Sequence, residues 1–281
     1  MSVKIKEEYT MIINHNMNAL NAHRNMGVNN TQAGKSMEKL SSGLRINRAG
    51  DDAAGLSISE KMRGQIRGLE QASRNSQDGI SMIQTGEGAL TETHSILQRM
   101  RELAVQSSND TNVTADRTAI AEEMDALQKE ITRIAGDTEF NKQTMFSTGT
   151  TVSFQVGANK DQIISVKFGA MSAGALKVDG MSVAISTQAG ATAAICTIND
   201  ALESVSTERS KLGAVQNRLE HTIANVDNAA ENLTAAESRV RDVDMAKEMM
   251  NFSKNNILQQ AAQSMLSQAN QQPQNVLSLL R

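Results

Sequence analysis

Two adjacent carboxylates of this 281-residue chain, Asp51 and Asp52, have a type and spacing that could support acid–base chemistry. An acid–base pair needs further groups around one substrate, and no histidine or third carboxylate stands beside these two in the sequence. The preceding residues 47–50 interrupt the helical periodicity, and aspartate is a preferred N-cap residue. We therefore interpret Asp51 or Asp52 as the cap of a following helix, with a charge that suits the helix dipole.

The histidines, glycines and cysteine form no pattern typical of a catalytic or cofactor site. The four histidines are scattered: His15, His23, His94 and His221. None has the His-Glu-x-x-His spacing of a zinc protease, and Gly86-Glu-Gly88 is half of a nucleotide-binding fingerprint without a preceding strand. Cys196 is the single cysteine, too few for an internal disulfide or a cysteine-based zinc site. We predict no enzyme activity, no catalytic residue, no metal and no cofactor.

The composition favours extended helix packing over a compact core. Aromatic residues make up 2% of the chain, with no Trp, one Tyr and five Phe, although aromatic side chains supply much of the buried area of compact cores. One proline leaves nearly the whole length free to be helical. The net charge of −3, without a basic block, argues against nucleic-acid binding. The sixteen methionines are interpreted as adaptable packing residues.

Apolar residues spaced by threes and fours mark long helices that would position these side chains. In the stretch 53–106 one helix face carries Met62, Ile66, Leu69, Ala72, Ile80, Ile83, Leu90, Leu97, Met100 and Leu103, with Ser76 at the same spacing. At 1.5 Å per residue this helix would be about 80 Å long, which suits a rod. The stretch 115–135 has a coiled-coil seam, and the stretch 192–250 has a second long stripe. Gly79, Gly86 and Gly88 are expected to allow close contact between helices.

The middle of the chain has the residue types of a small β region. The runs 152–156 and 163–168 flank a polar turn that contains Gly157, which predicts a hairpin. A further short strand is expected at residues 181–185. The fold class predicted is mainly α: a long antiparallel helical coiled-coil bundle, or rod, with a small β-hairpin region in the middle.

The two terminal segments share an amphipathic but weakly apolar pattern. Residues 14–44 place a few Leu and Met side chains among Asn, Gln and Ser, and residues 251–281 are similar. Such helices have little to bury alone, so we expect them to be disordered in the monomer. Each end needs a partner, and a head-to-tail interface that does not close into a ring generates a filament.

Two blocks near opposite ends of the chain resemble a known family. LSSGLRINRAGDDAAGL, residues 40–56, is similar to the N-terminal signature of bacterial flagellin, and Lys211–Met249 is similar to its C-terminal signature. The matching stretches run from about Asn14 to Phe146 and from about Ala201 to Arg281. The short middle of this chain has almost no room for the outer domains of larger flagellins.

On this resemblance the chain is divided into six parts. Residues 1–10 are interpreted as a leader or non-native extension, with Met11 as the natural initiator. The helical segments of an inner filament core are residues 11–44 and 246–281; the halves of a rod domain are residues 45–149 and 191–245; the β-hairpin and variable middle is residues 150–190.

The resemblance implies a structural subunit that self-polymerises into the extracellular bacterial flagellar filament for motility. The resemblance also implies export through the flagellar type III channel, and the chain opens without a cleavable signal-peptide pattern. Implied partners are copies of itself, an export chaperone at the C-terminal segment, and hook-associated and cap proteins. The alternative is a hook–filament junction protein with similar terminal helices. Expected polymer-core contacts are Leu20, Leu40, Leu44, Ile257, Met265, Leu277 and Leu280.

The resemblance also implies an exposed surface that vertebrate Toll-like receptor 5 reads. Gln98–Val105 is similar to the segment concerned, and Arg99, Leu103 and Glu123 match its central contact positions. An arginine beside a leucine on a rigid helix is a plausible binding hot spot. The alternative role of Arg99 and Glu123 is charge pairing and packing between subunits.

Overall fold

The computed structural model describes the backbone of residues 16–279 and the side chains of residues 16–272. The leader interpreted at residues 1–10 and the expected contact residue Leu280 lie outside this range. The described chain is mainly helical, with small antiparallel hairpins in the middle, as predicted. It forms two compact units: a central unit, residues 64–233, and a terminal unit in which the chain up to Arg63 joins the chain from Thr234 onward.

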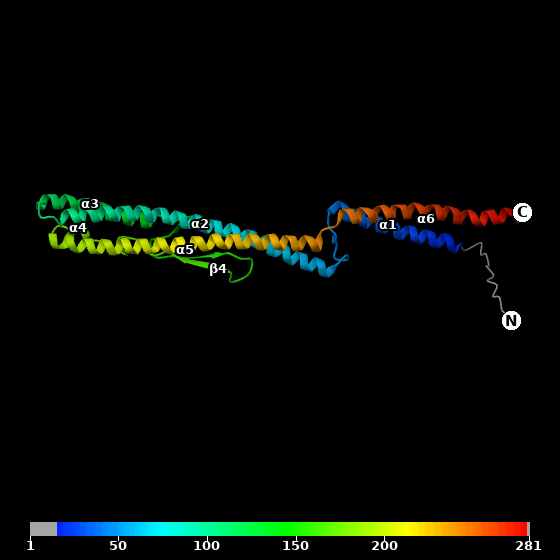
Figure 1. Cartoon of the computed structure of the whole chain (residues 1–281), viewed down its shortest axis with the longest axis horizontal. Helices are drawn as coiled ribbons and strands as arrows, with labels where there is room; N and C mark the ends of the chain where they lie inside the picture. Colours follow the sequence, from blue (N-terminus) through cyan, green and yellow to red (C-terminus); the bar gives the residue numbers. More distant parts are fainter. Residues whose placement is uncertain (1–15, 280–281) are drawn as a thin grey trace. The chain divides into compact units, whose positions relative to one another are not determined.

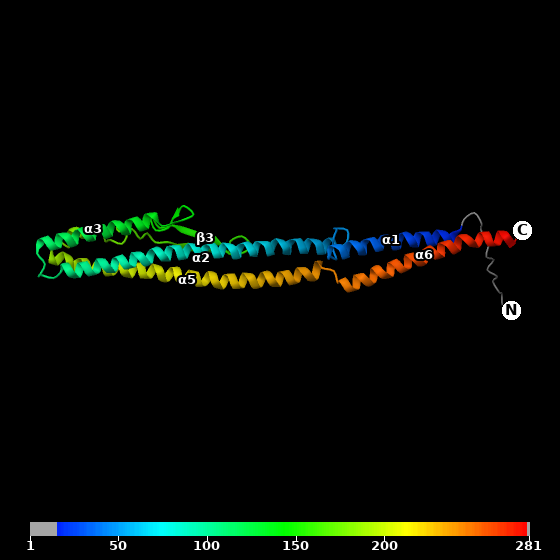
Figure 2. The same ribbon diagram turned by 90° about the horizontal axis from the view of Figure 1, so that it is seen from above.

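The central unit is an antiparallel helical bundle. Most of α2 (Ala53–Ser107) and α5 (Gln188–Arg241) run side by side in opposite directions, and α3 (Thr114–Asp137) folds back along α2 (Figures 1 and 2). The predicted stripe of α2 is its buried face: Ile83, Leu90, Leu97, Met100 and Leu103 are at most 1% exposed. Met124 and Ile131 of α3, and Val205 and Leu212 of α5, complete this core. The coiled-coil prediction is confirmed.

Two hairpins cover part of this bundle. β1 (Glu139–Phe140) pairs with β2 (Gln143–Thr144) across Asn141 and Lys142, whose φ angles of 51° and 63° fit a tight two-residue hairpin turn. The predicted hairpin is β3 (Thr151–Gln155) with β4 (Ile163–Lys167), paired antiparallel.

Aromatic rings from the β region explain two of the glycines in α2. A Cβ on Gly79 would lie 3.2 Å from Phe154, and one on Gly86 would lie 2.8 Å from Met145 and 3.2 Å from Phe146. The expectation of close helix–helix contact at these positions is therefore wrong, because the hairpin segments fill the space. At Gly88 an added Cβ meets nothing within 4 Å.

The strand expected at residues 181–185 is instead a single helical turn, α4 (Met181–Ala184). Gly180 at its start has a φ of 72°, a left-handed conformation that glycine tolerates. Met181 and Ile185, four residues apart, are both buried, and this spacing places them on one face of a helix. Ser107 at the end of α2 donates a hydrogen bond to the Ile185 carbonyl at 2.7 Å, which fixes the turn against the bundle.

The terminal unit contains α1 (Met17–Ser42) and α6 (Met245–Leu279), which lie side by side (Figures 1 and 2). The Asn16 side chain accepts the Ala19 N–H at 3.1 Å and caps α1. The helix ends at Gly43, whose φ of 72° and N–H bond to the Lys39 carbonyl are typical of a helix C-terminus. Helices are thus found in both terminal segments, and their disorder in the monomer stays a prediction.

Candidate assembly surface

The contact between α1 and α6 is built from small and polar side chains. Buried residues of this pair are Ala33 and Ser36 of α1 and Asn255 and Ala269 of α6, each 5–8% exposed. Asn16 adds a hydrogen bond from Nδ2 to the Ala269 carbonyl at 2.7 Å. Small side chains allow close approach of helix backbones, and many Cα atoms of α1 lie within 8 Å of α6. The pair has a close interior with little apolar area.

Several large apolar side chains of the same two helices are exposed to solvent. Leu20 is 66% exposed, Met250 66%, Ile257 65% and Met265 61%. A helix in a soluble domain normally turns its largest apolar residues toward the core, and gathered apolar exposure marks an interaction site. The α1/α6 pair therefore presents to solvent the side chains that another polypeptide would cover.

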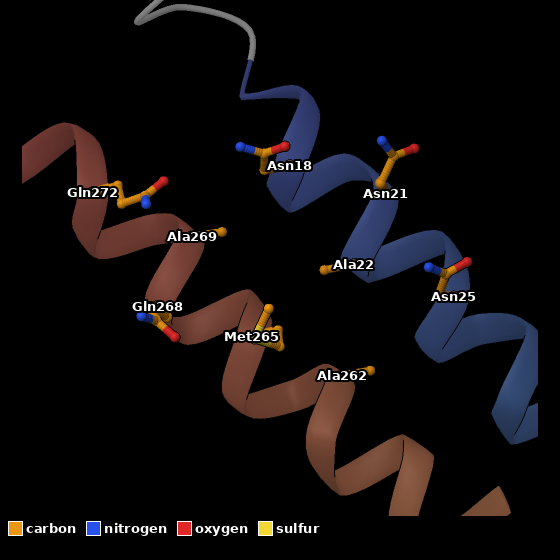
Figure 3. A pocket seen from close by; sticks show the side chains of 9 residues that line it. All are labelled: Asn18, Asn21, Ala22, Asn25, Ala262, Met265, Gln268, Ala269 and Gln272. Atoms are coloured by element: carbon orange, nitrogen blue, oxygen red, sulfur yellow. The ribbon is translucent and has the colours of Figure 1, made fainter.

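A groove of about 430 Å³ runs between α1 and α6 (Figure 3). Its walls carry amide side chains, with Met265 between them: Asn18, Asn21 and Asn25 from α1, and Gln268 and Gln272 from α6. Each amide can both donate and accept hydrogen bonds. A groove with a thioether beside adaptable amides suits an amphipathic helix of mixed polarity, which is the character of α1 and α6 themselves.

The expected polymer-core residues are placed differently from one another. Leu20 and Ile257 are exposed, Met265 is exposed within the groove, and Leu40 and Leu44 are half-buried. Leu277 lies within α6, at a position where only the backbone is described. Val28 and Met37 of α1 are also exposed. Val28 was not singled out from the sequence, because a weak helical stripe does not show which face a partner covers.

The elbow between α1 and α2 is organised by the two aspartates. The Asp52 carboxylate accepts the Gly55 N–H at 2.9 Å and caps α2, as predicted for one of the pair. The Asp51 carboxylate accepts the N–H groups of Arg48 at 3.0 Å and Asn47 at 3.2 Å. The backbone hydrogen bonds from Arg48 and Asn47 hold the pKa of Asp51 below its usual value, and the bond from Arg48 has the larger effect.

The elbow is joined to the α5–α6 connection by backbone hydrogen bonds. The Arg45 N–H donates to the Arg241 carbonyl at 2.7 Å, and the Val243 N–H donates to the Gly43 carbonyl at 3.0 Å. Leu44 and Asp242 form an antiparallel bridge between them. The two chain segments that lead into α1 and α6 are therefore fixed to each other.

Side chains near the elbow add a second set of links that the sequence did not reveal. Ser59 donates to the Glu237 carboxylate at 2.7 Å, and Arg241 bonds Glu60 at 2.9 Å. The hydrogen bond from Arg241 is the main reason that the pKa of Glu60 is lowered. These partners are about 180 positions apart, and no local spacing signals such pairs.

The charged cluster expected on the central unit is present around Arg99. Its guanidinium bonds Glu123 of α3 at 3.0 Å and Glu102 at 3.1 Å. Hydrogen bonds to Glu102 and, to a smaller extent, to Glu123 raise the pKa of Arg99. Leu103, however, is 1% exposed. The expected exposure of Leu103 is wrong, because its position on the α2 stripe turns it into the bundle.

In the part of the chain that the structure describes, no cluster of His, Cys, Asp and Glu could hold a metal ion. Among the same residues, no helix is long and apolar enough to cross a membrane.

Both end regions of the chain match known protein families. Residues 13–151 match the family model of the bacterial flagellin N-terminal helical region, and residues 195–280 match that of the C-terminal helical region. Flagellin from Halalkalibacterium halodurans is 63% identical over 272 residues, covering 96% of this chain and 100% of the relative. Flagellin from Bacillus subtilis is 55% identical over 304 residues, with the same coverage.

A solved structure with a similar fold is that of a putative flagellar hook-associated protein from Vibrio parahaemolyticus. It has a TM-score of 0.56 and 13% sequence identity, and covers 68% of this chain and 100% of that chain. At this identity the likeness concerns the fold alone. The full-length matches above have four to five times that identity, and by them this chain belongs to the bacterial flagellin family.

Proposed function

We propose that the protein is the structural subunit of a bacterial flagellar filament and polymerises with copies of itself through the exterior of its α1/α6 pair. The observation that carries this proposal is the exposure of Leu20, Met250, Ile257 and Met265 on a pair whose interior is small and polar. Copies of one chain can cover such faces repeatedly, and a repeating head-to-tail contact that does not close gives a filament.

The alternative of a hook–filament junction protein is less well supported. Full-length identity of 55–63% links the chain to flagellins, whereas a hook-associated protein is matched at 13%. Membership of a structural protein family also supports the absence of catalysis. The six-part division of the chain is retained within this proposal, with residues 11–44 and 246–281 as the inner core of the filament.

The same proposal places the protein outside the cell, in the flagellum. Terminal helices that hold few buried apolar residues suit passage through a narrow type III channel as an extended chain, because they lose little on unfolding. An export chaperone would cover the exposed apolar residues of α6 before export. Hook-associated and cap proteins would meet the same faces at the two ends of the polymer.

Electron microscopy of purified monomer with short filament seeds tests the proposal. We expect long helical filaments from the wild-type chain in a mild precipitating salt. A Leu20→Asn/Ile257→Asn variant should extend seeds poorly, while a Lys35→Gln variant, altered at an exposed polar site of α1, should extend them normally. If wild-type monomer with both ends intact does not extend the seeds, the filament assignment is overturned and the junction-protein alternative is favoured.

We also propose that Arg99 and Glu123 form a surface that Toll-like receptor 5 reads, with buried Leu103 supporting Arg99 from the core. Exposed arginine held by two carboxylates has a fixed direction, which suits a binding anchor. Arg99→Ala should weaken receptor signalling. Arg133→Ala is the matched control, since Arg133 is also exposed and bonded to two carboxylates, Glu130 and Asp137. Equal signalling by both folded variants would contradict this assignment.

A further inference from the structure

The methionines of the two units differ sharply in exposure. In the central unit Met82, Met100, Met124, Met145, Met171 and Met181 are all buried, at 0–7% exposed. In the terminal unit Met17, Met37, Met245, Met249, Met250 and Met265 are 49–66% exposed. Met26 and Met62 of the terminal unit are half-buried. Every described methionine of the terminal unit is therefore accessible to some degree, and every one of the central unit is covered.

We infer that the six exposed methionines are oxidation sites, and that their oxidation by peroxide prevents the free subunit from assembling. In a subunit that has already assembled, the neighbouring copies protect these methionines from peroxide. This inference rests on the proposed polymerisation. Methionine oxidation follows the exposure of the sulfur, so the reaction is directed to the face that another copy would cover. The central unit keeps its fold, because its methionines are shielded within the bundle.

The reaction is a two-electron oxidation by hydrogen peroxide. The thioether sulfur attacks one peroxide oxygen and forms a sulfur–oxygen bond while the oxygen–oxygen bond breaks. The second oxygen leaves as water after taking up a proton. The sulfur is oxidised to a sulfoxide and the peroxide is reduced, so no further electron donor is needed. Methionine sulfoxide reductases restore the thioether.

The consequence for assembly follows from the surroundings of these residues. Met265 lies between the amide-lined walls of the groove (Figure 3), and Met250 is among the most exposed apolar side chains of α6. A thioether is flexible and apolar, and packs well at an adaptable surface. A sulfoxide is a strong hydrogen-bond acceptor, which is costly to bury without a donor. Subunits oxidised on this face should therefore add slowly to a filament end.

Peptide mass spectrometry after brief peroxide treatment tests the exposure pattern. The chain should carry Cys196→Ser, because the exposed thiol of Cys196 is also oxidised. In the folded monomer we expect oxidation of the six exposed methionines at least about tenfold faster than of the six buried ones. In denaturant the difference should vanish, and in preassembled filaments the fast sites should slow toward the buried ones. Equal rates in the folded monomer would overturn the inference.

Seeded extension tests the effect on assembly. Oxidised monomers should extend seeds about tenfold more slowly than untreated ones, and treatment with both methionine sulfoxide reductases should restore the rate. A chain with leucine at the six exposed positions should resist peroxide, while one with Met100, Met124 and Met145 changed to leucine should remain sensitive. Should the six-leucine chain assemble poorly before treatment, reductase rescue of the wild type decides.

The outcomes separate this inference from the proposal beneath it. Untreated monomer that does not extend seeds would refute polymerisation itself. Untreated monomer that extends seeds, together with oxidised monomer that extends them equally well, would refute only the oxidation block. Slow extension that reductases do not reverse would assign the damage to another residue, and would also refute it.

Discussion

The central and terminal units are built from the same kind of amphipathic helix, but they put their large apolar side chains on opposite sides. In the central unit Leu90 and Leu97 are at most 1% exposed, whereas Leu20 and Ile257 of the terminal unit are 65–66% exposed. Burial of one such side chain contributes about 1.5–3 kcal/mol. The central unit thus gains this free energy within one chain, and the terminal unit gains it only when another molecule covers its surface.

This difference separates folding from assembly. A bundle with a filled core is stable as a monomer, but a helix pair that buries Ala, Ser and Asn has little to offset the entropy of ordering. Ordering of the terminal unit on association would be a coupled folding event. Helical periodicity therefore identifies an apolar face but does not indicate whether the partner of that face belongs to the same molecule.

The largest expected effect is on the core of the central unit. Leu97→Ala removes a fully buried side chain and leaves a cavity, so the free energy of unfolding of the monomer should fall by about 2–5 kcal/mol. Urea denaturation followed by far-UV circular dichroism measures this. Leu20→Ala, at an exposed site, should change it by less than about 0.5 kcal/mol. Equal losses at the two sites would contradict the difference in burial between the two units.

The next effect concerns the close contact of α1 with α6. Ala33→Leu places a large side chain where Ala33 is 6% exposed, and overpacking should destabilise the assembled terminal unit by about 1–3 kcal/mol. Thermal depolymerisation of filaments would show a lower midpoint. Gly34→Ala is the control, because its added Cβ meets nothing within 4 Å. A normal midpoint for Ala33→Leu would show that the α1/α6 pair is not close in the polymer.

A smaller effect is expected on the outer face of α6. Ile257→Ala removes part of an exposed apolar side chain, so the monomer should unfold as before while subunit addition loses about 1.5 kcal/mol. This corresponds to a rise of about tenfold in the critical concentration for filament growth, which sedimentation of filaments measures. An unchanged critical concentration would remove Ile257 from the assembly surface.

The smallest effect is the response of the elbow to pH. The pKa of Asp51 is lowered in the folded chain from a usual value of 3.8, so its stabilising contribution is present above that value and is lost as pH falls through the lowered pKa. Amide hydrogen-exchange protection of Asn47 and Arg48 should decline with acid in this window. Asp51→Asn should flatten the decline. An identical profile in the variant would assign the loss to other carboxylates.

Much of the fold follows from local pattern. The eleven-residue stripe between Met62 and Leu103 predicts α2 and its buried side, and the runs around Phe154 and Val166 predict the larger hairpin. Local pattern fails at residues 181–185, where β-branched residues suggest a strand but none of the described strands pairs with this segment. It also fails at Gly86, since the side chains that fill the space are those of Met145 and Phe146, which are distant in sequence.

The candidate site was predicted less completely than the fold. Exposure of Leu20 and Ile257 depends on which faces of α1 and α6 contact each other. Small residues such as Ala33 determine these faces, because they allow the two backbones to approach closely. A hydrophobic periodicity gives such small residues little weight. Leu103 shows the reverse case, since a residue marked by resemblance as a contact is part of the core stripe. The Ser59–Glu237 and Arg241–Glu60 links required knowledge of chain pairing.

The joined elbow has a mechanical consequence. The Leu44–Asp242 bridge and its flanking hydrogen bonds connect two antiparallel backbones that continue into α1 and α6. Tension on α1 is therefore transmitted to the α5–α6 connection through the Arg45–Arg241 and Gly43–Val243 hydrogen bonds. A pulling force on one subunit is therefore shared between α1 and α6, and neither helix alone carries it.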